Sequence, residues 1–198
     1  MRILFRLCLV CLGCTLLGAC STPAPPPAPE NNLKPTTTIK DIMDSIVDPS
    51  ADVLWAAVET DIGPKGIEQH EPRTDEEWAT VRKSAVQLLE ATNLLLIEGR
   101  TVAKPGEKSA TPGIELEPEQ IEALINGDRP TFVKNALGLR QEAQGAFNAI
   151  EARNAQALSD AGAGIDTACE NCHKIYWYPK DKRPAPTAPT PATSSPGN

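Results

Sequence analysis

Residues 154–178 read NAQALSDAGAGIDTACENCHKIYWY, and this stretch decides how the rest of the chain is interpreted. Its apolar side chains recur every three or four positions, which is the spacing of one face of an α-helix. The recurring positions are Leu158, Ala161, Ile165, Ala168, Cys172 and Ile175. The pattern therefore predicts a helix from about Asn154 to Tyr178 with these side chains turned inward.

The same stretch contains a C-x-x-C-H motif formed by Cys169, Cys172 and His173. Two cysteines at this spacing can each be alkylated by one of the two vinyl groups of a single haem. The histidine that follows is then placed to bind the haem iron, so this spacing is the attachment signature of c-type haem. The motif predicts one covalently attached haem c, held by both cysteines, with His173 as the proximal iron ligand.

Other uses of the motif are less consistent with the chain. Structural zinc takes four nitrogen or sulfur ligands, whereas the mature chain offers only Cys169, Cys172, His70 and His173. A thioredoxin-like redox pair would lie near a βαβ pattern, and no strand pattern is visible. A plain disulfide between the two cysteines remains open as an alternative.

The N-terminus has the pattern of a bacterial lipoprotein signal peptide. Two arginines precede an apolar run over residues 7–17 that is too short to span a bilayer. The run ends in Leu17-Gly18-Ala19-Cys20, which resembles the lipobox cleaved before a lipidated cysteine. We therefore expect a signal peptide over 1–19, lipid on Cys20, and a membrane-anchored protein in the bacterial periplasm. An ordinary secretory signal that ends in cysteine is the alternative.

The six cysteines of the chain are all accounted for by these two expectations. Three would leave with the signal peptide, one would carry lipid, and two would hold haem, so that no thiol stays free. In that order they are Cys8, Cys11, Cys14, Cys20, Cys169 and Cys172.

Composition excludes several classes of function. The net charge of −7 disfavours binding to nucleic acid, and no glycine-rich phosphate loop indicates a nucleotide site. No general base or nucleophile accompanies the haem motif, so we expect a protein that is not an enzyme.

Proline-rich stretches mark the edges of one domain. Residues 20–37 and 179–198 lack apolar periodicity and are expected to be a linker and a disordered tail. Between them, residues 38–178 suffice for a single domain with one core.

Helical periodicity runs throughout that domain. We expect long helices at about 38–61, with a kink or break at Asp48-Pro49, and at about 75–100, followed by a short helix at 118–126. A third long helix starts at about 128, and its predicted face is flanked by further apolar residues. The face consists of Val133, Leu137, Arg140, Gln144 and Phe147, and the flank of Phe132, Ala136, Ala143 and Ile150. With the helix that carries the motif, these predict an all-α fold, a four-helix up-down-up-down bundle with haem near the end of its last helix.

A haem motif at the end of the last helix of such a bundle resembles the cytochrome c′ family, the class II cytochromes c. The matching residues are Cys169, Cys172, His173 and Tyr176, whereas Trp177 stands where the family often has arginine. The resemblance covers about residues 38–178. It implies an electron carrier where the distal iron ligand is methionine, and binding of a small gas where the distal residue is apolar. It also makes a homodimer possible.

Met43 is the candidate distal ligand. It is the only methionine besides Met1, and it lies about five residues inside its helix, as His173 does from the opposite helix end. At about 1.5 Å per residue, both are ~7 Å from the same end of an up-down bundle. The resemblance also places the distal residue in this part of the first helix. Filling of the core by a flexible side chain is the alternative role for Met43.

We therefore expect a monohaem c-type cytochrome that transfers electrons in the periplasm, tethered to the membrane and serving a membrane-bound redox partner. The alternatives are a five-coordinate haem protein that binds NO or CO, and a haem-bearing subunit of a larger complex. Basic residues near the haem end form either a docking patch for the partner or part of a mixed, solvated surface. They are Arg100, Lys104, Arg129, Lys174, Lys180, Lys182 and Arg183.

Overall fold

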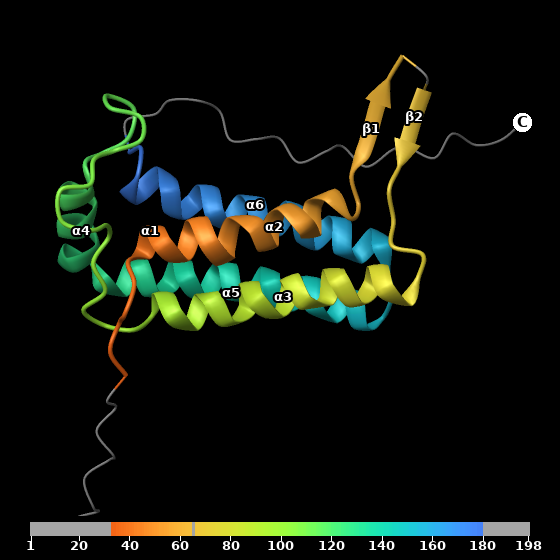
Figure 1. Ribbon diagram of the computed structural model, residues 1–198, viewed down its shortest axis with the longest axis horizontal. Helices are drawn as coiled ribbons and strands as arrows, with labels where there is room; N and C mark the ends of the chain where they lie inside the picture. Colours follow the sequence, from red (N-terminus) through yellow and green to blue (C-terminus); the bar gives the residue numbers. More distant parts are fainter. Residues whose placement is uncertain (1–32, 65, 180–198) are drawn as a thin grey trace, which may run out of the picture. The chain divides into compact units, whose positions relative to one another are not determined.

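The computed structural model describes residues 33–64 and 66–179, which are mostly helical (Figure 1). The helical elements are α1 (Ile39–Ile42), the π-helical turn η1 (Met43–Val47), α2 (Asp48–Ala56), α3 (Asp75–Leu95), α4 (Pro118–Gly127), α5 (Arg129–Glu151) and α6 (Ala155–Tyr176). The prediction of a mainly helical domain is confirmed. The predicted signal peptide, Cys20, most of the linker and nearly all of the tail lie outside the described residues.

Local capping explains where the helices begin. The side chains of Thr38 and Thr74 each accept a hydrogen bond from a backbone N–H in the first turn of the following helix. In return, the backbone N–H of each threonine donates to the carboxylate of the acidic residue three positions later. These capping boxes satisfy N–H groups that have no partner within a helix. Asp128 and Asn154 cap α5 and α6 in the simpler way, through the side chain alone.

The first helical segment runs without a break through η1, so the predicted break at Asp48-Pro49 takes the form of a π-turn. The N–H of Asp48 donates to the carbonyl of Met43, five residues back. A proline ring presses on the carbonyl four residues before it in a regular α-helix, and the wider turn ahead of Pro49 relieves that contact. The segment ends at Ala56, so the predicted extension to residue 61 is wrong.

A β-hairpin follows where only helical periodicity was expected. Strands β1 (Thr60–Gly63) and β2 (Gly66–Gln69) pair antiparallel, with Ile62 opposite Ile67. Each strand has four residues, which is too short for an alternating pattern to stand out against helical spacing. All of the hairpin side chains that the structure describes are exposed.

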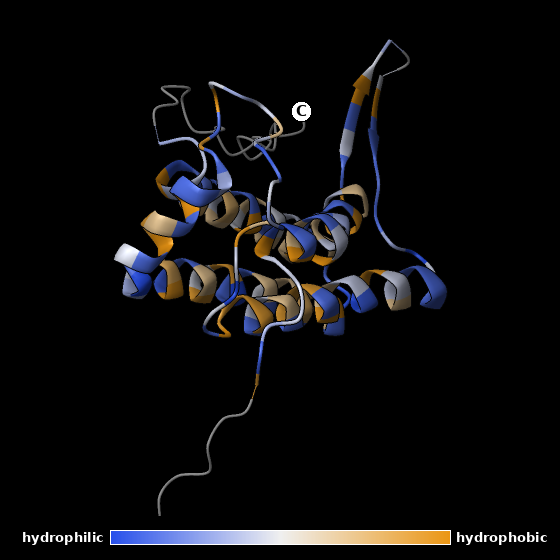
Figure 2. Ribbon diagram, turned by 60° about the vertical axis from the view of Figure 1, so that its left-hand side comes forward, coloured by the Kyte–Doolittle hydropathy of each residue, from blue (hydrophilic) through white to orange (hydrophobic). Residues whose placement is uncertain are grey.

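The long helices lie side by side and bury one apolar core (Figures 1 and 2). Helix α5 packs against α6 and α3, α2 packs against α3 and α6, and α4 contacts the ends of α5 and α6. Among the fully buried side chains are Leu54, Leu88, Ala143, Leu158 and Ile165. No helix within the described ranges is long and apolar enough to cross a membrane.

Three details of the predicted helices are wrong. Helix α3 ends at Leu95 rather than near residue 100. On α5, Leu137, Arg140 and Gln144 are exposed. The predicted flanking residues Phe132, Ala136, Ala143 and Ile150 are all buried, and Leu139, Ala146 and Ala149 complete the core face of α5. On α6, Ile175 was expected inside but is 42% exposed.

Candidate functional site

The last two turns of α6 carry the C-x-x-C-H motif. Cys169, Cys172 and His173 are spaced i, i+3 and i+4, so they share one face of the helix. All three line a cavity of about 180 Å³ that is partly open to solvent.

The other walls of this cavity come from three further helices and are mainly apolar. The segment from η1 to α2 contributes Met43, Val47, Ala51 and Trp55, α3 contributes Leu95, and α5 contributes Phe132, Ala136 and Leu139. The structure thus brings Met43 into the same cavity as the three motif residues, although 126 positions separate Met43 from Cys169 in the sequence. An apolar cleft with a few convergent polar groups is the usual form of a cofactor site.

Burial disfavours the ionised thiolate form of both cysteines. It raises the pKa of Cys169 to about 12 and that of Cys172 to about 11. Redox exchange uses the thiolate, which this burial disfavours. Among the described residues, no group of three or more His, Cys, Asp or Glu side chains is placed to hold a metal ion such as zinc. A thioether has no proton to lose and is not penalised by the same burial. The structure holds the two residues as free thiols with no disulfide between them.

His173 is enclosed by its own helix end. Burial lowers its pKa, which favours the neutral imidazole that binds metals. The rings of Trp177 and Tyr178 lie 5.8 and 5.9 Å from its ring centre. The backbone N–H groups of the same two residues donate to the His173 carbonyl. The residues that end α6 therefore fix the position of His173.

The aromatic residues after the motif divide between two roles. Tyr176 is 1% exposed and packs edge-to-face against Phe132, so it closes the end of the core. Trp177 lines the site cavity beside His173. Tyr176 therefore packs in the core, whereas its neighbour Trp177 forms part of the wall of the site.

A second cavity of about 220 Å³ adjoins the first. Met43 and His173 line both, and Lys40, Asp44 and Glu115 contribute polar groups to the second one alone. Met43 therefore has open space on two sides and is only partly buried. It also packs against the hydrophobic core, so its position is compatible with both core filling and a ligand role.

Two residues that the sequence analysis did not assign to the site belong to its walls. Trp55 donates its Nε1–H to the carbonyl of Gly162 at 3.0 Å, which ties α2 to α6 beside the cavity. A glycine within a helix often has a packing reason, and Gly162 is the signal that could have revealed this contact. Asp48 lines both cavities; nothing in its sequence context indicates this.

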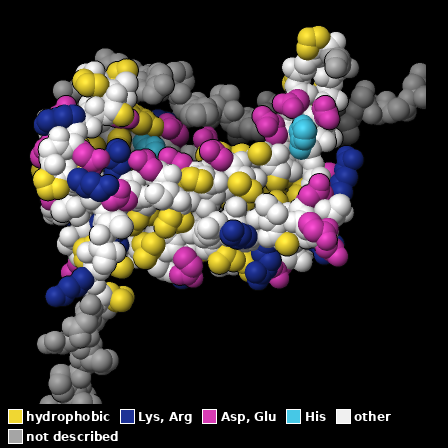
Figure 3. All heavy atoms as spheres, in the orientation of Figure 1, with side chains coloured by type: hydrophobic (Ala, Val, Ile, Leu, Met, Phe, Trp, Pro, Cys, Tyr) yellow, Lys and Arg dark blue, Asp and Glu magenta, His cyan; other side chains and the backbone are white. Residues whose placement is uncertain are grey.

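The predicted basic patch is mostly occupied by internal contacts. Lys104 pairs with Asp41 at 2.9 Å, and Lys174 pairs with Glu170 at 3.5 Å. The guanidinium groups of Arg100 and Arg129 donate to backbone carbonyls. Figure 3 shows acidic and basic side chains interspersed over the visible face, which favours the mixed, solvated surface. The remaining three cations of the predicted patch lie outside the described residues.

His70, the other histidine, lies just after β2 and is exposed. Its Nε2 is 3.1 Å from the carboxylate of Asp61, within the hairpin. It is not among the residues that line the motif cavity.

No protein-family model, curated protein or solved structure matches this chain. What the chain does must therefore be inferred from its own residues. Of these, Met43, Cys169, Cys172 and His173 carry the inference, because they converge on one apolar cavity.

Proposed function

We propose that this protein is a monohaem c-type cytochrome that carries electrons, built as a four-helix up-down-up-down bundle. The observation that carries the proposal is the convergence of the C-x-x-C-H motif and the only internal methionine on one apolar cavity. A bound haem would supply reversible one-electron chemistry. Cys169 and Cys172 would hold it covalently, and its donor set would be the His173 nitrogen and the Met43 sulfur.

The chain's own residues favour electron transfer. A histidine and methionine ligand pair raises the reduction potential of haem iron, and apolar walls exclude water from it. Leu95, Phe132 and Leu139 form such walls. The aromatic rings that enclose His173 restrict its movement, which keeps the ligand in place in both oxidation states.

Binding of a small gas is the second candidate function. The observation that favours it is the cavity on the far side of Met43, which gives the methionine room to move aside. The sixth iron position would then be open to NO or CO. The two functions differ in whether Met43 stays on the iron.

Absorption spectra of the purified protein, oxidised and reduced, with and without CO, test the proposal. We expect a low-spin spectrum with a weak sulfur-to-iron band in the far red and no response to CO. Met43→Leu should give a high-spin spectrum that changes with CO. Ile46→Leu, in the same turn but not lining either cavity, is the matched control. A wild-type protein that is high-spin and binds CO would favour the gas-binding function instead.

We also propose that lipid on Cys20 tethers the protein to a bacterial membrane on the periplasmic side, where it meets a membrane-bound redox partner. A linker over 21–37 in extended polyproline form would reach ~50 Å at about 3.1 Å per residue. Cys20→Ser should release the protein from membranes and slow electron transfer from a membrane donor. Unchanged rates would contradict the tether.

A further inference from the structure

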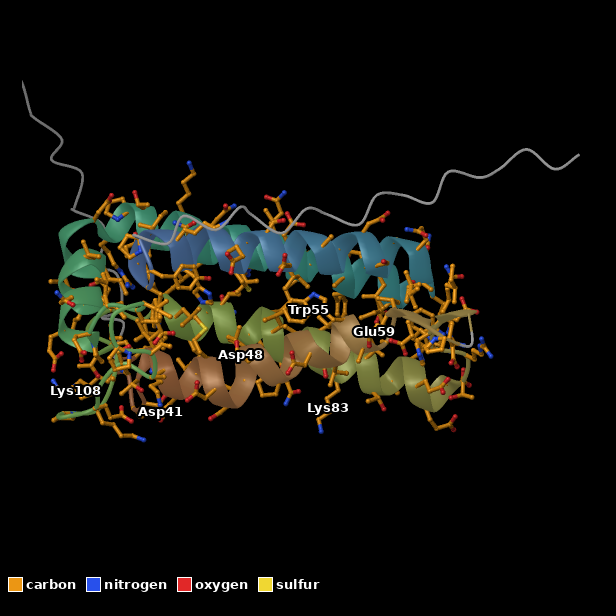
Figure 4. All side chains as sticks on the ribbon, turned by 90° about the horizontal axis from the view of Figure 1, so that it is seen from above. Asp41, Asp48, Trp55, Glu59, Lys83 and Lys108 are labelled. Atoms are coloured by element: carbon orange, nitrogen blue, oxygen red, sulfur yellow. The ribbon has the colours of Figure 1, made fainter. Side chains whose placement is uncertain are left out.

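Asp48 stands at the proposed iron site because of the π-turn before it. In a regular α-helix, residues five positions apart are separated by about 500°, which leaves them ~140° apart around the axis. The bond from the Asp48 N–H to the Met43 carbonyl closes a wider turn and brings the two residues to the same side. Both consequently line the two cavities together with His173. Figure 4 shows Asp48 and Trp55 on the side of α2 that faces α6.

The side chain of Asp48 is exposed, and its carboxylate has no partner among the described residues. Within the described part of the chain, no cation or hydrogen-bond donor contacts it. Other carboxylates around His173 are partnered: Glu170 pairs with Lys174 and accepts a bond from the Tyr178 hydroxyl, and Glu115 accepts one from Ser109. Asp48 therefore contributes an unpaired negative charge on this side of the site.

Two other aspartates, Asp44 and Asp166, also line the cavities, but they differ from Asp48 in position or in pairing. Asp44 lines only the second cavity and pairs with Lys40 at 3.3 Å. Asp166 lines only the first cavity, and its charge acts on Cys169 rather than on His173. Asp48 alone among these three lines both cavities beside His173 and Met43.

We propose that Asp48 tunes the iron site by favouring its oxidised state. This inference rests on the proposed haem function. Uptake of one electron from a redox partner lowers the positive charge of the iron by one. A negative charge beside the iron stabilises the more positive, oxidised form, and because the Asp48 side chain is exposed, solvent screens part of this effect. Asp48 thus offsets part of the rise in potential that methionine ligation brings, and places the carrier at a lower potential than its ligands alone would.

The test is an equilibrium redox titration of the haem-loaded full-length protein at fixed pH and salt. We expect the midpoint potential of Asp48→Asn to be higher than that of the wild type. Asp52→Asn removes the same charge from α2, one turn further on, but lines neither cavity, and it should stay close to wild type. The spectrum of Asp48→Asn should stay low-spin, which shows that ligation is unchanged.

A second variant keeps the test decisive if Asp48→Asn folds poorly. Asp48→Glu retains the charge, so its potential should remain close to that of the wild type. Equal shifts in the Asp48→Asn and Asp52→Asn proteins, or a shift in Asp48→Glu as large as in Asp48→Asn, would overturn the role of Asp48. Purified protein without covalent haem would overturn the proposed function, and this inference with it. Haem content measured in denaturant distinguishes the two failures.

Discussion

At the scale of the residue, two glycines on α6 show that the same substitution can have opposite effects. A methyl group on Gly162 would lie 3.2 Å from the Trp55 ring, which a hydrogen bond holds in place. A methyl group on Gly164 would meet only the flexible side chain of Glu142. The carboxylate of Glu142 can move towards solvent, whereas the indole cannot move without losing its bond.

We therefore predict that Gly164→Ala is neutral or stabilising and Gly162→Ala destabilising. Alanine in a helix gains about 1 kcal/mol over glycine, and crowding a packed site costs about 1–3 kcal/mol. Urea unfolding of the two variants measures the difference. Equal stability of both would show that Trp55 moves aside.

Glu77 in the capping box of α3 links stability to pH. Backbone N–H groups of Arg73 and Thr74 donate to its carboxylate and lower its pKa below the usual 4.5. A lowered folded-state pKa contributes stability above the unfolded value, and that stability is lost as the pH falls through the folded value.

Glu77→Gln should therefore reduce the unfolding free energy at pH 7 and have little effect once the wild-type carboxyl is protonated. Urea titrations at neutral and at acidic pH give the comparison. Glu76→Gln removes the same charge from the same turn but not the contact with the cap, and should show less dependence on pH. A Glu77→Gln effect that is the same at both pH values would contradict the linkage.

At the scale of the element, the π-turn η1 decides which side chains of the first helical segment face the site. Deleting the exposed Ser45 would leave Met43 and Asp48 four positions apart, so a regular α-helix would place them within about 40° of one another, on the same side. The deletion would therefore also keep the buried Ile39 and Ile42 on the core side of the helix.

We predict that this deletion keeps a low-spin spectrum and most of the helical content, because the regular helix leaves Met43 beside Asp48. Ser45→Ala is the control, since it keeps the length of the turn. Circular dichroism and absorption spectra provide the measurement. A deletion variant with a high-spin spectrum would show that the wide turn itself is needed to position Met43.

At the scale of the whole molecule, the number of reactive cysteine thiols tests three proposals together: covalent haem, lipid on Cys20 and removal of the signal peptide. After cleavage and lipidation, only Cys169 and Cys172 could react as thiols. Haem attachment converts both to thioethers, which a reductant does not release, whereas a disulfide would yield two thiols on reduction.

We predict that the mature protein, denatured and reduced, reacts with no equivalents of a thiol reagent. The Cys169→Ser, Cys172→Ser double variant should also lack covalent haem and melt at a lower temperature, because its site cavity lacks the bound group that stabilises the folded state. Two reactive thiols in the wild type would contradict covalent haem attachment.

The sequence by itself determined the mainly helical class and the starts of the long helices, because caps such as Thr74 and Asp128 act through bonds within one turn. It also placed the motif near the end of the last helix and put Met43 close to the start of the first. These features depend on residues only a few positions apart, so they can be recognised from short sequence patterns.

Only the tertiary structure decided which face of α5 is buried, where the π-turn falls and what surrounds His173. Alanine has too little apolar surface to mark the centre of a face, so the sequence placed Ala136 and Ala143 only at the flank of a face that included Leu137. The helices that pack against α5 decided between them. Asp48 reaches the site only because a π-turn rotates it there and α6 ends beside it, and both depend on contacts between distant segments.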